Sequence, residues 1–262
     1  MRATCQAVYL RLFSSIRILH PAWFSKYLSH QPTVACFKTE DTCISYRHWS
    51  NTSKPGLLFV HGHGAHSRWW DFIAPAFRDS HNVAAIDLSG SGDSGHRKTY
   101  SAQLYAREII GCIQATGMQT ATVVGHSFGG FVALEAGYQY GPEFGGLVLV
   151  DYTVAPPETY NEWGLRAQRE ILGPRTTRVY EDLDTALDRF RLLPEQAWEH
   201  ECVQKHIAKH SLRRVEGGWT WKFDPTMFDD LEMGADQHQK FARMRCRTAV
   251  ILGETSGDEG AQ

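Results

Sequence analysis

The residue best placed to do chemistry in this 262-residue chain is Ser127, at the centre of the run Gly125-His-Ser-Phe-Gly129. An apolar run, 121–124, precedes it and a helix-like run follows. A serine on a sharp strand-to-helix turn exposes its hydroxyl at the end of a sheet, where the helix N-terminus favours developing negative charge. Gly125 and Gly129 have no Cβ to collide as strand and helix close up. The pattern predicts a nucleophilic serine.

A second polar run, His61-Gly-His-Gly64, directly follows the apolar segment 57–60. In acyl-transfer chemistry of this kind, two backbone N–H groups bind the oxyanion. One belongs to the residue after the nucleophile and the other to a loop after an early strand. We therefore expect the amides of His63 and Phe128 to be the two donors of the oxyanion hole.

The same loop offers a competing chemistry. His61, His63 and His66 form an H-x-H-x-x-H run that resembles the metal-binding run of metallo-β-lactamase-like hydrolases. That run normally has an Asp just before its last His, where Ala65 stands here, and no second cluster with ligand spacing is obvious. A metallohydrolase that uses these three histidines is kept as an alternative, but no metal is predicted.

Around these runs, short β-rich segments alternate with helical ones. This is the pattern of an α/β fold with a mostly parallel, doubly wound sheet and helices on both faces. One helix is expected to begin after the N-cap Ser101 and to end before Gly117. The run Gly90–Gly95 is a literal G-x-G-x-x-G, but no helix opens within it, so we expect a loop and no cofactor. Strands are expected at residues 35–39, 43–49, 57–60, 82–87, 121–125, 146–150 and 249–252.

Residues 152–242 separate two of these strands and look helical. Roughly 90 residues is far more than a crossover needs. We therefore expect an inserted helical cap over the carboxyl ends of the strands, where open α/β sheets bind their ligands. The core sheet would then comprise residues 36–151 and 243–262. Residues 1–35, which contain Arg and Ser but no acidic residue, would be an N-terminal extension, either a mitochondrial presequence or a disordered or helical leader.

The runs His61–Gly64, Asp87–Gly95 and Gly125–Gly130 resemble, in order and spacing, the α/β-hydrolase superfamily in its lid-bearing branch. The resemblance covers residues 36–254. It implies an α/β-hydrolase fold with a cap and a hydrolytic activity. Haloalkane dehalogenases and epoxide hydrolases of this fold use an Asp nucleophile, so Ser127 favours esterases, thioesterases and C–C hydrolases instead.

The family's catalytic residues occur in the order Ser, then Asp or Glu, then His. We prefer Asp151, at the end of the strand before the cap, as the acid. Asp258 and Glu254, after the last strand, are alternatives. The family's His would follow one further strand, beyond Gln262, and no His occurs after His238. The resemblance therefore implies a truncated chain whose activity is impaired.

Composition limits the remaining possibilities. A net charge of −2 argues against a nucleic-acid binder with a basic surface. No run approaches the roughly 18–20 apolar residues of a membrane-spanning helix. Six scattered cysteines without a C-x-x-C pair favour reduced thiols. We expect a hydrolase of a small carboxylic ester or thioester, in the cytoplasm or, with a presequence, in mitochondria. A non-catalytic α/β-hydrolase-like binding or scaffolding protein is the alternative. Substrate identity and oligomeric state do not follow from the sequence.

Overall fold

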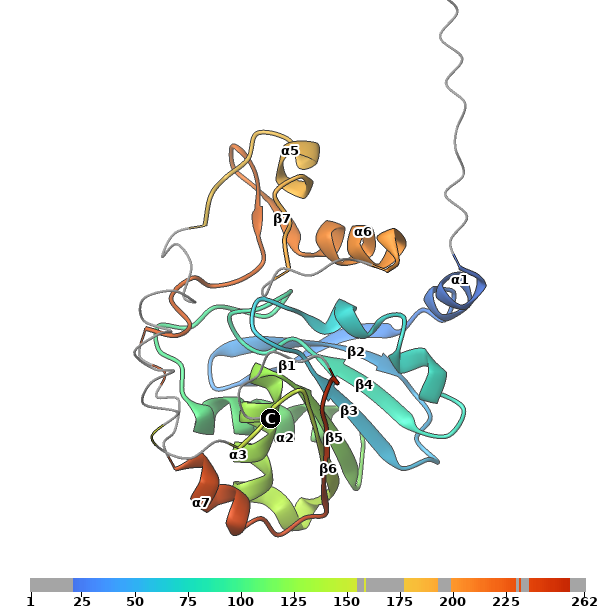
Figure 1. Cartoon of the computed structure of the whole chain (residues 1–262), viewed down its shortest axis with the longest axis vertical. Helices are drawn as coiled ribbons and strands as arrows, with labels where there is room; N and C mark the ends of the chain where they lie inside the picture. Colours follow the sequence, from blue (N-terminus) through green and yellow to red (C-terminus); the bar gives the residue numbers. More distant parts are fainter. Residues whose placement is uncertain are drawn as a thin grey trace, which may run out of the picture.

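A seven-stranded sheet in the order β1-β2-β4-β3-β5-β6-β9 forms the centre of the molecule (Figure 1). The pairs β1–β2 and β2–β4 are antiparallel, and every pair from β4 to β9 is parallel. This is the mostly parallel α/β sheet predicted from the sequence. The computed structural model describes residues 21–154, 158, 177–192, 199–229, 231 and 236–254. The sheet strands are β1 (Thr33–Thr39), β2 (Thr42–Trp49), β3 (Gly56–Val60), β4 (Asn82–Ile86), β5 (Ala121–His126), β6 (Phe144–Val150) and β9 (Thr248–Ile251).

All seven predicted strands are present, each within two residues of its expected ends. The apolar runs were informative because the inner strands are covered on both faces. The sheet begins at Thr33, inside the range expected as an extension. The helices are α1 (Ala22–Leu28), α2 (Ala102–Ala115), α3 (Phe128–Tyr140), α5 (Leu183–Leu187), α6 (Glu201–His210) and α7 (Gln237–Ala242), with 3₁₀ turns η1 (Ser67–Trp70), η2 (Ala74–Phe77) and η3 (Gly141–Glu143).

The alternating side chains of β3 divide the interior into two cores. Leu58 and Val60 belong to the larger core, which lies against α2 and α3. Leu57 and Phe59 belong to a smaller core on the opposite face, where the Phe59 ring lies 4.8 Å from that of Trp70 in η1. Figure 1 shows α2, α3 and α7 together on one side of the sheet. A strand buried on both sides cannot shift by one residue without exchanging the two cores, so the register of β3 is well specified.

Helix α2 begins and ends where the sequence predicts. The Ser101 side chain accepts a hydrogen bond from the Leu104 amide at 3.2 Å, and Gly117 takes a φ of 67° just after the last turn. Left-handed backbone at that position favours glycine, which explains why the helix stops there.

The segment between β6 and β9 contains α5 and α6 but also an antiparallel hairpin of β7 (Leu212–Val215) and β8 (Gly218–Trp221). The hairpin differs from the all-helical expectation. Glu216 and Gly217 connect the two strands. Gly217 in this turn and Gly218 at the start of β8 have φ values of 83° and 143°. In Figure 1, α5, α6 and β7 lie together at the end of the molecule away from α3 and α7. That this segment works as a cap stays a prediction.

Two further expectations need correction. Cys36 and Cys43 are joined by a disulfide, so reduced thiols were the wrong prediction for this pair. The β1–β2 register sets Cys36 opposite Ser45, two residues from Cys43, which makes the cysteines diagonal neighbours on one face. The apolar run at 249–252 also predicts a strand covered on both faces, but Val250 of β9 is 47% exposed.

The N-terminal residues 1–20, on which the presequence prediction rests, lie outside the described ranges. Within those ranges, every helix falls short of the length and apolarity that crossing a bilayer requires.

Candidate active site

Ser127 lies on a strained turn between β5 and α3. Its φ and ψ are 50° and −120°, a left-handed φ that costs a non-glycine residue on the order of 1 kcal/mol. The turn is fixed from both sides, because the Ser127 amide donates to the Val150 carbonyl at 2.9 Å and the Ser127 carbonyl accepts from the Gly130 amide at 2.7 Å. Strain of this kind persists only where the surroundings impose it and is concentrated at functional sites.

The glycines on either side of Ser127 stand where no side chain fits. A Cβ on Gly125 would collide with the Gly129 carbonyl, and a Cβ on Gly129 would lie 2.5 Å from the carbonyl oxygen of His61. Strand β5, helix α3 and the loop after β3 therefore meet backbone to backbone. This is the physical reason for glycine that the sequence suggested.

The loop after β3 lies directly against the nucleophile turn. A Cβ placed on Gly62 would lie 3.3 Å from the Cβ of Ser127. The next residue, His63, and Phe128 both contact the ring of Phe228, at centroid distances of 4.6 and 5.2 Å. The structure thus brings Ser127 and the two predicted donor residues to one place. Binding of an oxyanion by their amides stays a prediction.

The buried side chain of His61 determines how this loop is held. The Leu88 amide donates to Nε2 of His61 at 3.1 Å, so Nε2 carries no proton. Nδ1 must then carry the proton, and it donates to the Gly62 carbonyl at 2.8 Å. Burial lowers the pKa of His61, in agreement with a neutral ring. The Gly62 carbonyl points to the His61 ring. The His63 N–H belongs to the same trans peptide, so it points in the opposite direction, away from His61.

These contacts also bear on the metallohydrolase alternative. Both ring nitrogens of His61 are engaged, and Nε2 of His66 lies 3.0 Å from the Ser211 hydroxyl. Among the residues that the structure describes, no three His, Cys, Asp or Glu side chains are grouped so that they could hold a metal ion. His61 and His66 thus each form a hydrogen bond with a distant segment, at Leu88 and at Ser211.

The preferred acid, Asp151, leaves the sheet beside Ser127. In the β5–β6 register, His126 pairs with Val150, so the next residues are Ser127 and Asp151. Asp151 also has a positive φ, 49°, and one of its carboxylate oxygens accepts from the Gly253 amide at 3.4 Å. Its role as the acid stays a prediction. The alternative Glu254 is exposed, and Asp258 lies outside the described residues.

A general base is not evident in the described part of the chain. There, no side chain forms a hydrogen bond with the Ser127 hydroxyl. His126 is adjacent in sequence, and burial lowers its pKa while the charge of Asp151 raises it. The turn at Ser127 and the loop after β3, both singled out in the sequence, thus lie side by side in the structure.

Buried histidines lead to a prediction about stability. Burial lowers the pKa of His66 well below its ordinary value and that of His210 to about 3. Above pH 6.5 these rings are neutral in both the folded and the unfolded chain. As the pH falls below 6.5, only the unfolded chain binds the protons, so the free energy of unfolding should fall. Each such ring contributes up to about 1.4 kcal/mol per pH unit.

The measurement is urea unfolding between pH 7.5 and 5. His66→Gln should make the free energy of unfolding less dependent on pH than in the unmodified protein, whereas His238→Gln, at an exposed histidine, should not. Equal pH dependence in the unmodified protein and His66→Gln would contradict the prediction.

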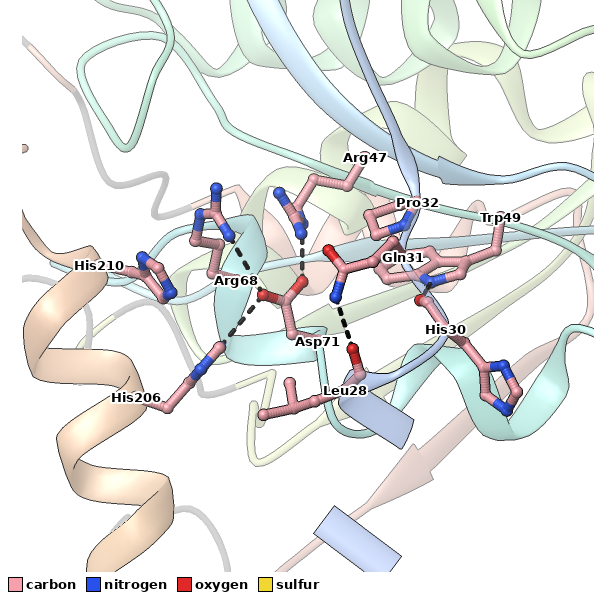
Figure 2. A pocket seen from close by; sticks show the side chains of 10 residues that line it. All are labelled: Leu28, His30, Gln31, Pro32, Arg47, Trp49, Arg68, Asp71, His206 and His210. Carbon is pink, nitrogen blue, oxygen red and sulfur yellow. Dashed lines mark hydrogen bonds and ion pairs between the residues drawn. The ribbon is translucent and has the colours of Figure 1, made fainter. Parts of the chain in front are cut away.

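A cavity of about 250 Å³ lies apart from this site, between α1, β2, η1 and α6 (Figure 2). The Asp71 carboxylate at its centre pairs with Arg47 at 2.6 Å, Arg68 at 3.6 Å and His206 at 3.1 Å. Ser127 does not line it. Sequence reasoning missed this cluster, because no local pattern pairs residues so far apart. The other lining residues are Leu28, His30, Gln31, Pro32, Trp49 and His210.

Comparison with known proteins decides the family. Residues 57–261 match the alpha/beta hydrolase family. The chain belongs to this family. Its relatives within the family include the esterase Rv0045c of Mycobacterium tuberculosis, 27% identical over 186 residues, which make up 69% of this chain and 60% of the esterase. Epoxide hydrolase 1 of Caenorhabditis elegans is 30% identical over 121 residues, 45% of this chain and 28% of that protein. The matches thus span less than two thirds of either relative.

Solved structures of alpha/beta hydrolases superimpose on most of the chain. The thioesterase domain from the curacin biosynthetic pathway has a TM-score of 0.64 at 21% identity and covers 85% of this chain and 83% of that domain. The crystal structure of the esterase Rv0045c has a TM-score of 0.62 at 21% identity and covers 92% of this chain and 83% of the esterase. At such identities the likeness establishes the fold alone.

Proposed function

We propose that the chain is a serine hydrolase that cleaves a carboxylic ester or thioester through Ser127. The observation that carries the proposal is the positive φ of Ser127 on a turn where neither flanking glycine has room for a Cβ. A strained serine on a strand-to-helix turn at the end of the sheet is the arrangement that presents a nucleophilic hydroxyl.

In the proposed reaction, Ser127 Oγ forms a bond to the acyl carbon. The carbonyl oxygen takes up the negative charge and is bound by the amides of His63 and Phe128. The bond to the alcohol or thiol then breaks, which leaves an acyl-serine that water hydrolyses. Asp151 would orient the base that removes the serine proton. The two amides supply the largest stabilisation, since one oxyanion donor is commonly worth about 10²–10³ in rate.

We further propose that turnover by the described residues alone is slow. Without a base at the hydroxyl, serine is a weak nucleophile. Esters with a good leaving group need no proton donated to that group, so p-nitrophenyl esters are the substrates on which activity should be detected first. The name of the relative Rv0045c, an esterase, supports this class. A non-catalytic binding protein is the competing proposal, and the same assay separates the two.

The test is covalent labelling. A fluorophosphonate phosphonylates an activated serine at the site of the acyl group, so mass spectrometry of the digested protein should locate one adduct, at Ser127. An adduct on another serine, or none after prolonged exposure to excess probe, would overturn the proposal.

A further inference from the structure

The ring of Phe228 borders the candidate site from the segment that follows β8. It contacts the ring of His63 edge to face, with centroids 4.6 Å apart and planes at 81°, and that of Phe128 at 5.2 Å and 76°. These are the two residues whose amides are the proposed oxyanion donors. Phe228 itself is only half-buried, and it packs against the larger core.

The segment that carries Phe228 is fixed to the core. The Asp224 carboxylate is buried and accepts hydrogen bonds from the Tyr100 hydroxyl at 2.7 Å and from the Thr226 amide at 2.9 Å. The Asp224 amide donates to the Gly90 carbonyl at 2.7 Å. Met227, next to Phe228, is 2% exposed within the larger core. With anchors on both the loop at residue 90 and the core, the aromatic ring is held in place.

The side chain of Phe228 is expected to restrict the acyl part of a substrate more than the alcohol part. When the carbonyl oxygen occupies the oxyanion position, the acyl α-carbon is bonded directly to the carbonyl carbon. On the alcohol or thiol side, the carbonyl carbon is bonded to an oxygen or sulfur that cannot branch. The first carbon that can branch is therefore one bond further from the carbonyl carbon. A ring that packs against the side chains of both donor residues is therefore placed to meet substituents on the acyl α-carbon first.

We propose that Phe228 determines substrate class, restricting the enzyme to esters or thioesters whose acyl chain is unbranched at the carbon next to the carbonyl. This inference rests on the proposed function. An extra methyl group that a pocket cannot accommodate changes kcat/KM by about 10–200-fold, which sets the size of the discrimination to expect.

The experiment compares two isomeric substrates, p-nitrophenyl butyrate and p-nitrophenyl 2-methylpropanoate, which have equal carbon counts and the same leaving group. Rates are taken as the difference from Ser127→Ala. The unmodified protein should prefer butyrate by at least about 10-fold in kcat/KM. Phe228→Ala should reduce that preference severalfold, chiefly by accelerating the branched ester. Phe228→Leu keeps more of the packing and should give an intermediate ratio of the two kcat/KM values. The test can therefore be made even if Phe228→Ala does not fold.

Phe77→Ala is the matched control, because Phe77 is an exposed aromatic residue of η2, and its ratio should equal that of the unmodified protein. If the unmodified protein discriminates but the Phe228 variants keep the same ratio, or if it does not discriminate, this inference is wrong and the proposed function stands. If no rate depends on Ser127, the proposed function fails, and the inference with it.

Discussion

Replacing Ser127 with alanine is expected to abolish fluorophosphonate labelling and the acyl-serine route, leaving for p-nitrophenyl butyrate only the residual hydrolysis that binding and the oxyanion donors support. Alanine removes the only atom that forms the acyl bond and leaves the proposed oxyanion donors in place, which alone support a small residual rate. The melting temperature should change little, because no described side chain depends on the Ser127 hydroxyl. The measurement is kcat/KM together with fluorophosphonate labelling.

Ser80→Ala is the control for this experiment, since Ser80 is an exposed serine on the turn after η2. It should keep full activity and full labelling. Activity retained in Ser127→Ala would mean that another group is the nucleophile, and the strained turn would then need a different explanation.

The second large effect concerns stability. Asp71→Asn should lower the free energy of unfolding by about 3–5 kcal/mol. Asp71 and Arg47 are both about 5% exposed in their side chains and lie 2.6 Å apart. The variant keeps the shape of the side chain but removes its charge, so a buried guanidinium loses its counterion. Urea unfolding at pH 7.5 measures the change.

Asp79→Asn is the matched control. Asp79 pairs with Arg78 at 3.3 Å, but its side chain is 93% exposed, and such pairs contribute roughly 0–1 kcal/mol. A second variant distinguishes the net contribution of the ion pair from the cost of leaving one buried charge without its partner. Arg47→Met combined with Asp71→Leu removes both charges and should recover much of the stability lost in Asp71→Asn. If Asp71→Asn unfolds with nearly the same free energy as the unmodified protein, the pair is not important to the fold.

The fold could be predicted wherever buried strands or helices appear in the sequence as a pattern of consecutive residues. Strands β3 and β4 are buried on both faces and appear in the sequence as apolar runs, and Ser101 marks the start of α2 by capping it. The β7–β8 hairpin was missed because strands of four residues are too short to show a period. Its turn carried only a weak signal, since the two-residue connection is Glu216-Gly217, with a single glycine at a left-handed position.

Within the candidate site, the residues that sequence reasoning found belong to contiguous motifs. The turn at Ser127 is such a motif, since its backbone requires glycine at fixed offsets. The contact of Phe228 with His63 could not be predicted, because it depends on how distant segments pack. The Cys36–Cys43 disulfide lies between these cases. The two cysteines are seven residues apart in neighbouring predicted strands. That spacing could have predicted the disulfide, whereas the number of cysteines alone could not.

The order of the strands has a consequence for synthesis on the ribosome. Six of the seven sheet strands, β1 to β6, come from one continuous stretch, so they can assemble as soon as Val150 has emerged. Their last neighbour, β9, arrives much later, as the contact between Gly253 and Asp151 spans 102 positions. At about 5–20 residues per second, the edge of β6 stays open for roughly 5–20 s. An open apolar strand edge is a template for pairing with other chains, so nascent chains of this protein should need chaperone protection during that interval, and shortening the 152–242 segment should reduce the need.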